Sequence, residues 1–343
     1  MNVVATARSL PGYRPVRTRL LASLAGFGTL AAAVCLLAPL VGSTSISLAR
    51  AFDPSIPFAD NIDAQIFFIA RLPRVTAAAL VGGTLAAAGV VFQALLRNPL
   101  ADPFTLGISA GASAGAMFAI VLGASVAMVP PVPVASLLGA ALGALVVYRL
   151  ATLRRAPLST SVLLLAGVTL NSFFGASVMA LQFVADFTQV ARAARWLMGD
   201  LDVGSFGPIG SALLLVAPAF VLFAFLPSSL NVLSLGTDAA AARGVDVHRA
   251  QRTAFLGSAL ATAGAVSLAG PVGFVGIIVP HLVRLLVGGD HRVLLPASAL
   301  AGAAFLVICD LVARTAFSVQ LPVGIVTALI GGPFFLWLLV RKG

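Results

Sequence analysis

The side chains able to carry chemistry are few in this 343-residue sequence, and their types exclude most catalytic centres. All 11 acidic residues are aspartates, and 20 of the 21 basic residues are arginines. A Walker A loop needs a lysine that reaches the nucleotide phosphates, yet the single lysine, Lys342, is the penultimate residue. No cysteine or carboxylate stands at metal-ligand spacing from the three histidines, His248, His281 and His291. The sequence therefore predicts a protein without catalytic residues, metal or cofactor.

The sharpest local pattern of charged residues is RLPR at residues 71–74. Arginines three apart share one helix face, and proline is tolerated at a helix start. Such a pair either places its guanidinium groups among lipid headgroups or binds acidic groups of an external partner. Arg314 is a third candidate for the same role, and its spacing from Asp310 also permits a local ion pair. The residues alone leave these alternatives open.

The elements that must position these arginines are apolar segments. Hydrophobic residues make up 60% of the chain and charged residues 9%, against roughly 25% charged residues in soluble domains. The mean hydropathy is +1.07. This excludes a soluble enzyme, a disordered protein and a secreted disulfide scaffold, and it predicts an all-α polytopic membrane protein. Ten spans are predicted, at residues 20–42, 75–96, 104–124, 129–148, 157–185, 206–227, 253–270, 273–288, 293–313 and 322–340.

The net charge of +10 is interpreted as a topology signal rather than as a sign of a nucleic-acid partner. With the N-terminus inside the cell, the inner segments hold 15 Lys and Arg residues and the outer segments hold 6. The first apolar segment is longer than the apolar region of a signal peptide and is predicted to remain as an uncleaved helix. Both termini, including a tail at residues 1–19, are therefore predicted to be cytoplasmic.

Three segments are too polar to span a membrane. Residues 43–70 form a predicted outer excursion, and residues 186–203 form a short outer helix at the membrane interface. Residues 228–252 form the longest inner loop. Within it, a helix over residues 239–243 is predicted from a capping signal at 236–238 and a closing Gly244. A cytoplasmic helix between two spans is a natural docking site for another protein.

The predicted membrane interior lacks a coupling site for an ion-driven carrier, because no aspartate falls near the middle of a span. Asn171, Ser172 and Gln182 in the fifth span either line a path or bond between helices. Glycines every four residues at 107–115 and at 139–143 indicate close helix packing. LAAAGVV at 85–91 resembles LATAGAV at 260–266 in the opposite orientation, which suggests an inverted repeat. We predict one transmembrane domain over residues 1–343.

Four motifs in the chain resemble the FecCD/BtuC family, the permease subunits of type II ABC importers for iron–siderophores, haem and vitamin B12. They are RLPR at 71–74, QALLRNPLADPFTLGISAGASAGA at 93–116, GPVGFVGIIVPHLVRLLVGGDHR at 270–292 and LPVGIVTALIGGPFFLWLL at 321–339. The resemblance implies ten spans and a homodimer around a central path in the bacterial inner membrane. It also implies two cytoplasmic ATP-binding subunits and a periplasmic substrate-binding protein as partners.

The resemblance also assigns roles to residues. In that family, arginines at the RLPR positions and at the motif matched by residues 312–314 receive acidic residues of the binding protein. Arg71, Arg74 and Arg314 are therefore expected to dock it. The coupling loop corresponds to residues 236–247, which places four residues in or beside the ATPase groove: Asp238, Arg243, Gly244 and Val245.

The expected mechanism is ATP-driven movement of the coupling helices, which switches the central path between outward and inward access. The cargo stays open among haem, a ferric siderophore and cobalamin, with iron complexes favoured because many family members carry them. The alternative is a secondary transporter that is not coupled to an ATPase.

Overall fold

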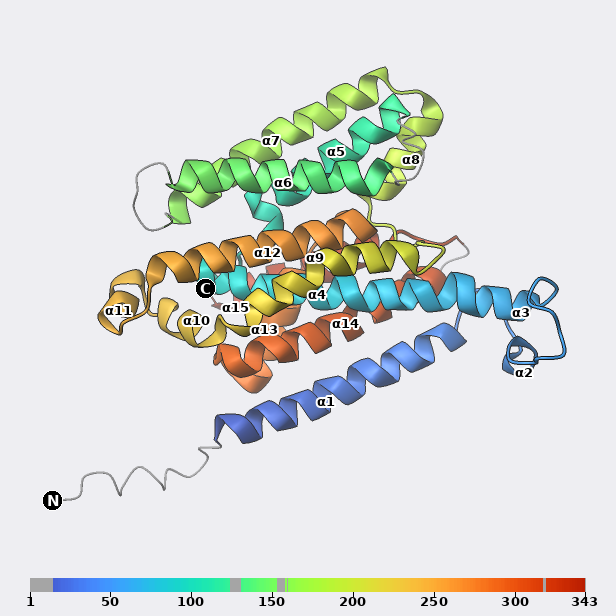
Figure 1. Cartoon of the computed structure of the whole chain (residues 1–343), viewed down its shortest axis with the longest axis horizontal. Coiled ribbons are helices and arrows are strands. Elements are labelled where there is room, and N and C mark those ends of the chain that lie inside the picture. The colour runs from blue at the N-terminus through green and yellow to red at the C-terminus, as the bar shows by residue number, and fades with distance from the viewer. Residues whose placement is uncertain (1–14, 124–130, 153–157, 159, 317–318, 343) are drawn as a thin grey trace.

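The computed structural model describes residues 15–123, 131–152, 158, 160–316 and 319–342, and these residues form an all-helical protein (Figure 1). Residues 1–14 of the predicted tail, and Arg154 and Arg155 of the predicted inner set, lie outside the described residues. The longer helices are α1 (Val16–Leu37), α4 (Leu72–Leu95), α5 (Ile108–Leu122), α6 (Pro131–Thr152), α7 (Thr160–Val184), α9 (Gly207–Ala224), α12 (Val247–Ala269), α13 (Val275–Val287), α14 (His291–Thr315) and α15 (Val323–Lys342).

Short helices fill the polar segments between them. They are η1 (Ala38–Leu40), α2 (Leu48–Ala51), α3 (Ile62–Gln65), η2 (Ile66–Arg71), η3 (Pro103–Leu106), α8 (Phe187–Leu197), α10 (Pro227–Leu233) and α11 (Thr237–Ala242). The predicted outer helix within residues 186–203 is α8, which begins with a capping box between Asp186 and Gln189. The helix predicted at 239–243 is α11, which begins two residues earlier and is followed by Gly244 at a φ of 78°.

The prediction of an all-helical membrane protein is confirmed. Among the described residues, six helical segments are long and apolar enough to cross a membrane: Val16–Leu40, Ile62–Leu95, Val132–Thr152, Thr160–Val184, Gly207–Ala224 and His291–Thr315. Shorter apolar helices cover Ile108–Leu122, Val275–Val287 and Val323–Trp337. Each predicted apolar segment coincides with one of the longer helices. That all ten cross the membrane stays a prediction.

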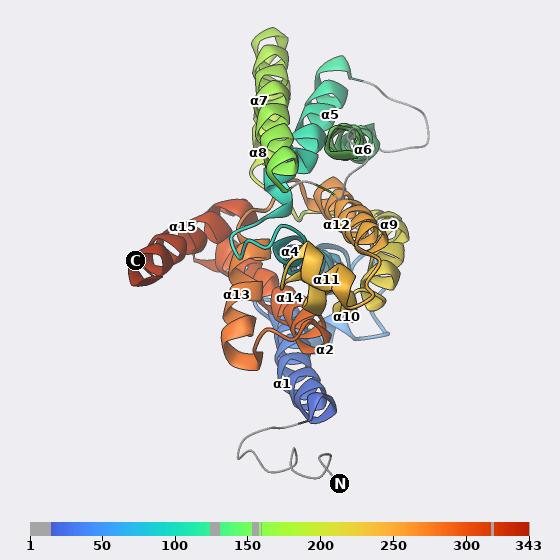
Figure 2. The ribbon, with the colours of Figure 1, turned by 90° about the vertical axis from the view of Figure 1, so that its left-hand side faces the viewer.

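Helix α4 forms the centre of the protein. It packs against α12, α13 and α14, while α1 covers α14 and α9 covers α12. Helices α5, α6, α7 and α8 form a second group, which lies beside the first (Figure 1 and Figure 2). Most residues of α4 are buried, whereas few residues of α1 and α7 are, as expected of helices that face lipid.

The predicted glycine packing is confirmed in α5 and α6, where a Cβ on Gly111 would collide with the backbone of Gly139. Helices α4 and α14 approach each other in the same way. A Cβ on Gly302 of α14 would lie 2.5 Å from the Ala86 Cβ and 3.0 Å from the carbonyl carbon of Gly82. The two backbones therefore touch with no space for a side chain between them.

Gly302→Ala is expected to destabilise the protein by about 1–3 kcal/mol, because the added methyl group must push two packed helices apart. Thermal unfolding of the purified protein in detergent measures this. Gly175→Ala is the matched control, because a Cβ at this helical position meets no atom within 4 Å. This substitution also replaces a flexible residue by a good helix former. Equal stability of the two variants would contradict the close α4–α14 contact.

Several helices start at other residues than the predicted spans, and two of these differences have a clear local cause. The third predicted span begins at Ile108 rather than at 104, because Gly107 adopts a φ of 77° and separates the 3₁₀ turn η3 from α5. The seventh begins at Val247 rather than at 253, because the Asp246 carboxylate accepts a hydrogen bond from the Arg249 N–H at 3.0 Å and starts α12 among polar residues. Hydropathy alone therefore missed the polar first turns of α12.

Asp102 is buried in the loop before η3. Its Oδ1 accepts a hydrogen bond from the Phe104 N–H at 3.2 Å, which caps that turn. Burial raises the pKa of the Asp102 carboxyl to about 7, while the hydrogen bond from Phe104 acts in the opposite direction. The folded protein therefore holds a proton on this carboxyl at slightly acid pH, where the unfolded chain has released it.

Because the folded state binds more protons here, the stability contributed by a neutral Asp102 is lost as pH rises through 7. We expect a loss of about 1 kcal/mol between roughly pH 6 and pH 8. Thermal unfolding across this range measures it. Asp102→Asn retains an acceptor for Phe104 but does not ionise, so its profile is expected to be flatter. The same slope in this variant as in the unaltered protein would contradict the assignment to Asp102.

Candidate functional site

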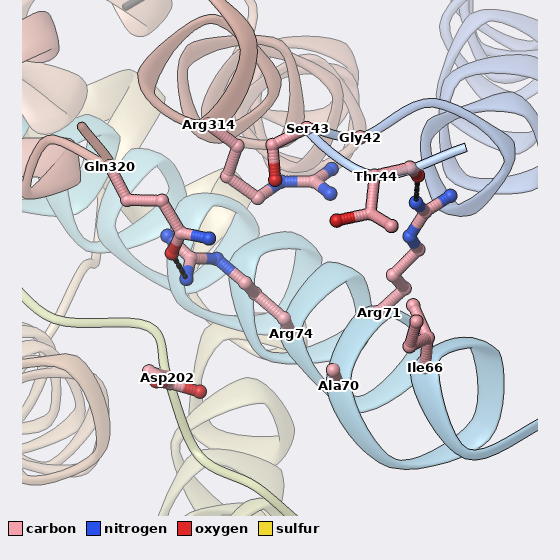
Figure 3. A pocket seen from close by; sticks show the side chains of 10 residues that line it. All are labelled: Gly42, Ser43, Thr44, Ile66, Ala70, Arg71, Arg74, Asp202, Arg314 and Gln320. Carbon is pink, nitrogen blue, oxygen red and sulfur yellow. Dashed lines mark hydrogen bonds between the residues drawn. The ribbon is translucent and has the colours of Figure 1, made fainter. Parts of the chain in front are cut away.

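Arg71, Arg74 and Arg314 meet at one cavity of about 240 Å³ (Figure 3). Arg71 ends η2, a π-helical segment that runs into α4, and Arg74 lies in the first turn of α4 beside Pro73. Arg314 lies in the last turn of α14. The cavity is also lined by residues 42–44, Ile66, Ala70, Asp202 and Gln320. The structure thus brings Arg314 to the two arginines of the RLPR motif, which are far from it in the sequence.

A buried carboxylate holds two of the three arginines. Asp310 Oδ1 lies 2.8 Å from Arg74 Nε, and Asp310 Oδ2 lies 3.0 Å from Arg314 Nε. The local ion pair that the spacing of Asp310 and Arg314 permitted is therefore formed, one helical turn apart on α14. Asp310 is fully buried, while Arg74 and Arg314 are 8% and 5% exposed. Each carboxylate oxygen therefore faces one guanidinium group away from water.

Main-chain carbonyl groups after α1 hold Arg71 and also reach Arg314. Arg71 Nη1 donates to the Pro39 carbonyl at 3.0 Å and to the Leu40 carbonyl at 3.2 Å, and its Nη2 donates to the Thr44 carbonyl. Arg314 donates to two carbonyls of the same segment at 3.3 Å each. We call residues 38–44 the carbonyl segment. It supplies neutral acceptors, so it orders the arginines without cancelling their charge.

The electrostatic result is an excess of positive charge around the cavity. Three guanidinium groups face it, and the one carboxylate bound to them, Asp310, is shared by two. The Gln320 side chain accepts a hydrogen bond from Arg74 at 3.4 Å, and Asp202 lies on the opposite wall (Figure 3). A carboxylate side chain entering this cavity meets guanidinium donors, and hydrogen bonds between two charged groups are stronger than those between neutral ones.

A second cavity of about 480 Å³ adjoins the first and shares Arg74, Asp202 and Gln320 with it. Its far wall comes from α8, including the exposed Arg195, which lies one turn after the exposed Arg192. The outer helix predicted from the sequence therefore borders the arginine site. The sequence had not linked them, because their proximity depends on tertiary packing.

The residues predicted to couple to an ATPase lie at the opposite end of the molecule, in and after α11 (Figure 1). Asp238, Arg243 and Gly244 are exposed, and Val245 is half-buried. Ala240 is fully buried and fixes α11 against the rest of the chain. The described structure thus presents a short, exposed helix at one end and the arginine cavity at the other.

Two of the three polar residues predicted in the fifth span make hydrogen bonds within the protein, and whether they also line a path stays a prediction. The Asn171 side chain of α7 donates a hydrogen bond to the Phe104 carbonyl of η3 at 3.2 Å. Ser172 donates to the Val168 carbonyl of its own helix at 3.2 Å. Both side chains therefore donate hydrogen bonds within the same chain.

Comparison with known proteins identifies the family. Residues 30–341 match the FecCD transport family. The chain belongs to this family. A cobalamin import system permease protein, BtuC, from Halobacterium salinarum is 46% identical over 269 residues, which cover 78% of this chain and 72% of that one. The hemin transport system permease protein HmuU of Yersinia pestis is 39% identical, covering 81% of this chain and 84% of its own.

A solved structure supports the same assignment. It is described as an inward-facing conformation of a metal-chelate type ABC transporter, and it matches with a TM-score of 0.79 and 30% identity. The match covers 94% of this chain and 99% of that one. This FecCD protein is therefore the permease subunit of an ABC importer, a multi-pass membrane protein that assembles with ATPase subunits and is not itself catalytic. The resemblance drawn from the four motifs is confirmed.

Proposed function

We propose that this permease moves an iron complex, either haem or a ferric siderophore, or cobalamin from the periplasm to the cytoplasm. The relatives described above are a cobalamin permease and a hemin permease, and the similar structure is of a metal-chelate type transporter. The observation that carries the proposal is the placement of a cationic cavity and an exposed short helix at opposite ends of the protein. An importer needs one face for the protein that delivers cargo and one for the ATPase.

The cavity lined by Arg71, Arg74 and Arg314 is the proposed docking site for a periplasmic substrate-binding protein. Acidic side chains of that protein enter and bind the guanidinium groups. Two observations support this role: the excess of positive charge around one cavity, and the use of neutral carbonyl groups to order Arg71. Lipid headgroup binding is the weaker alternative, because all three arginines are buried rather than extended toward a bilayer.

The proposed contact with the ATP-binding subunits is made by α11 and the turn after it, with Asp238, Arg243, Gly244 and Val245 in or beside the ATPase groove. The exposure of the first three residues supports this. Residues 186–203, of which α8 is part, are assigned to the periplasmic face. Residues 228–252, with α10 and α11, are assigned to the cytoplasmic face.

The proposed assembly contains two copies of the permease around a central path, two ATP-binding subunits and one binding protein in the bacterial inner membrane. Each permease is a single domain with ten spans and both termini in the cytoplasm, the N-terminal one in the tail at 1–19. The repeated segments at 85–91 and 260–266 lie on α4 and α12, which pack against each other, and this supports an inverted repeat.

Uptake into proteoliposomes tests the function. The permease, its ATPase and its binding protein are reconstituted together, and haem, a ferric siderophore and cobalamin are supplied in parallel. ATP-dependent uptake of one of the three is expected. Uptake that continues without the ATPase, or that follows an ion gradient, would contradict the proposal and favour a secondary transporter.

A further inference from the structure

Helix α14 is a long element whose two ends both lie at a proposed partner site. Its last turns carry Asp310 and Arg314 at the arginine cavity. Its first residue, His291, and the residue before it, Asp290, contact α10, the helix that precedes α11. Twenty residues separate the two aspartates, which corresponds to about 30 Å along a helix, the thickness of the hydrocarbon core of a bilayer.

The amide side chain of Asn231 joins α10 to the start of α14. Asn231 Nδ2 donates to Asp290 Oδ1 at 2.8 Å, and Asn231 Oδ1 accepts from the His291 N–H at 2.8 Å. The same Oδ1 lies 2.7 Å from His291 Nδ1, so that ring nitrogen carries the hydrogen. All three contacts fall on the two residues that begin α14. We call this set of contacts the Asn231 clamp.

The first turn of α14 depends on such external support. Pro296 lies inside the helix and has no N–H to donate to the carbonyl of Arg292, four residues earlier. Asp290 caps the turn by accepting from the Arg292 N–H at 3.1 Å. The side chains of Arg292 and Asn231 both donate hydrogen bonds to the Asp290 carboxylate. These bonds hold the pKa of Asp290 well below its ordinary range. Asn231 therefore contacts the segment where α14 is least held by its own backbone.

Beyond Pro296, α14 is packed against α4 with little freedom to shift. Gly302 and Gly82 touch backbone to backbone, and a Cβ on Gly83 would lie 2.9 Å from the Ala299 carbonyl oxygen. At the far end, Asp310 of α14 bonds Arg74 of α4. The helices α4 and α14 are thus packed closely together from the turn after Pro296 to the arginine cavity.

We propose that Asn231 is a positioning residue that ties the ATPase-facing helices α10 and α11 to α14, and so links the ATPase site to the arginine cavity at the other end. This inference rests on the proposed function. Movement of α10 by the ATPase pulls on the start of α14 through the clamp, and docking at Arg74 and Arg314 acts on the same helix from the other side. Coupling of this kind is a free energy shared by two sites.

The test uses the whole importer in proteoliposomes and compares ATP hydrolysis with and without the binding protein. In Asn231→Ala, stimulation of hydrolysis by the binding protein is expected to fall at least about fivefold. The basal rate of hydrolysis and the affinity for the binding protein in the absence of ATP are expected to stay unchanged. Ser228→Ala, at an exposed position of α10, is the matched control and is expected to be stimulated normally. A loss of basal hydrolysis in parallel with stimulation would indicate a merely structural role and overturn the proposal.

Two further variants sharpen the test. Asn231→Asp keeps the size of the side chain and the acceptors for His291 but faces Asp290 with a like charge, so it is expected to lose stimulation even if Asn231→Ala does not fold. Asp290→Ala removes one of the three contacts of the clamp and is expected to lose part of the stimulation. The double variant Asn231→Ala/Asp290→Ala is expected to lose no more than Asn231→Ala, because that change already removes the whole clamp. Normal stimulation of Asn231→Asp, or losses that add in the double variant, would overturn the proposal.

These outcomes are separate from failure of the proposed function. An unaltered importer without ATP-dependent uptake contradicts the function itself, whatever Asn231 does. An active importer whose stimulation by the binding protein is unchanged in the Asn231 variants contradicts only the role proposed for the clamp.

Discussion

Arg71→Glu is expected to weaken binding of the periplasmic partner about 100-fold or more and to abolish uptake. Truncating one partner of a buried, hydrogen-bonded charge pair costs about 2–5 kcal/mol, where each 1.4 kcal/mol is tenfold in affinity, and charge reversal adds repulsion. Among the three arginines, Arg71 is the cleanest probe. Its hydrogen bonds go to main-chain carbonyls of the carbonyl segment, whereas a change at Arg74 or Arg314 also removes one of the two partners of Asp310.

The measurement is the affinity of the binding protein for reconstituted permease, together with ATP-dependent uptake. Arg50→Glu is the matched control, because it makes the same change of charge at an exposed side chain near the same end of the molecule. Arg50 lies 3.7 Å from Asp63 and is 69% exposed, and surface pairs of this kind contribute little. If Arg71→Glu and Arg50→Glu bind the partner equally well, Arg71 does not dock it.

The sequence predicted the course of the helices well because membrane spans are long and uniformly apolar. It could not predict where polar helix ends lie. The first two turns of α12 carry Arg249 and Arg252, and the Asp246 cap holds the helix start, so hydropathy places the start of this helix too late. Likewise, the 3₁₀ turn before α5 is separated from that helix by the positive φ of Gly107, and hydropathy does not predict such a backbone conformation.

In the arginine site, too, the sequence predicted the local features and missed those that depend on tertiary packing. The spacing within RLPR and the turn between Asp310 and Arg314 are local, so the sequence indicated both. The carbonyl segment is not local, because the Pro39 and Leu40 carbonyls reach Arg71 only after α1 packs against α14 and the chain turns back toward η2. The same packing buries the arginines. Neither the burial nor the shared role of Asp310 between two helices is readable from spacing.

The second large effect is expected at Asp310. Asp310→Ala is expected to lower the free energy of unfolding by about 3–5 kcal/mol, because removing one partner of a buried ion pair leaves uncompensated charge. Here two guanidinium groups lose their counter-charge at once, and Arg71 lines the same cavity. Chemical unfolding of the purified protein in detergent measures the change. Asp60→Ala, at an exposed aspartate near the same end, is expected to change stability by less than about 0.5 kcal/mol.

A double variant separates the loss of the ion pair from the loss of packing. Adding Arg74→Met to Asp310→Ala removes one of the two stranded positive charges and keeps an apolar chain of similar length. Arg314 still donates to the carbonyls of Ala38 and Val41, so its charge stays partly solvated. The double variant is therefore expected to be more stable than Asp310→Ala by about 1 kcal/mol or more. Additive losses from the two changes would mean that Asp310 acts through packing alone, and the site would then not depend on a buried carboxylate to hold its arginines together.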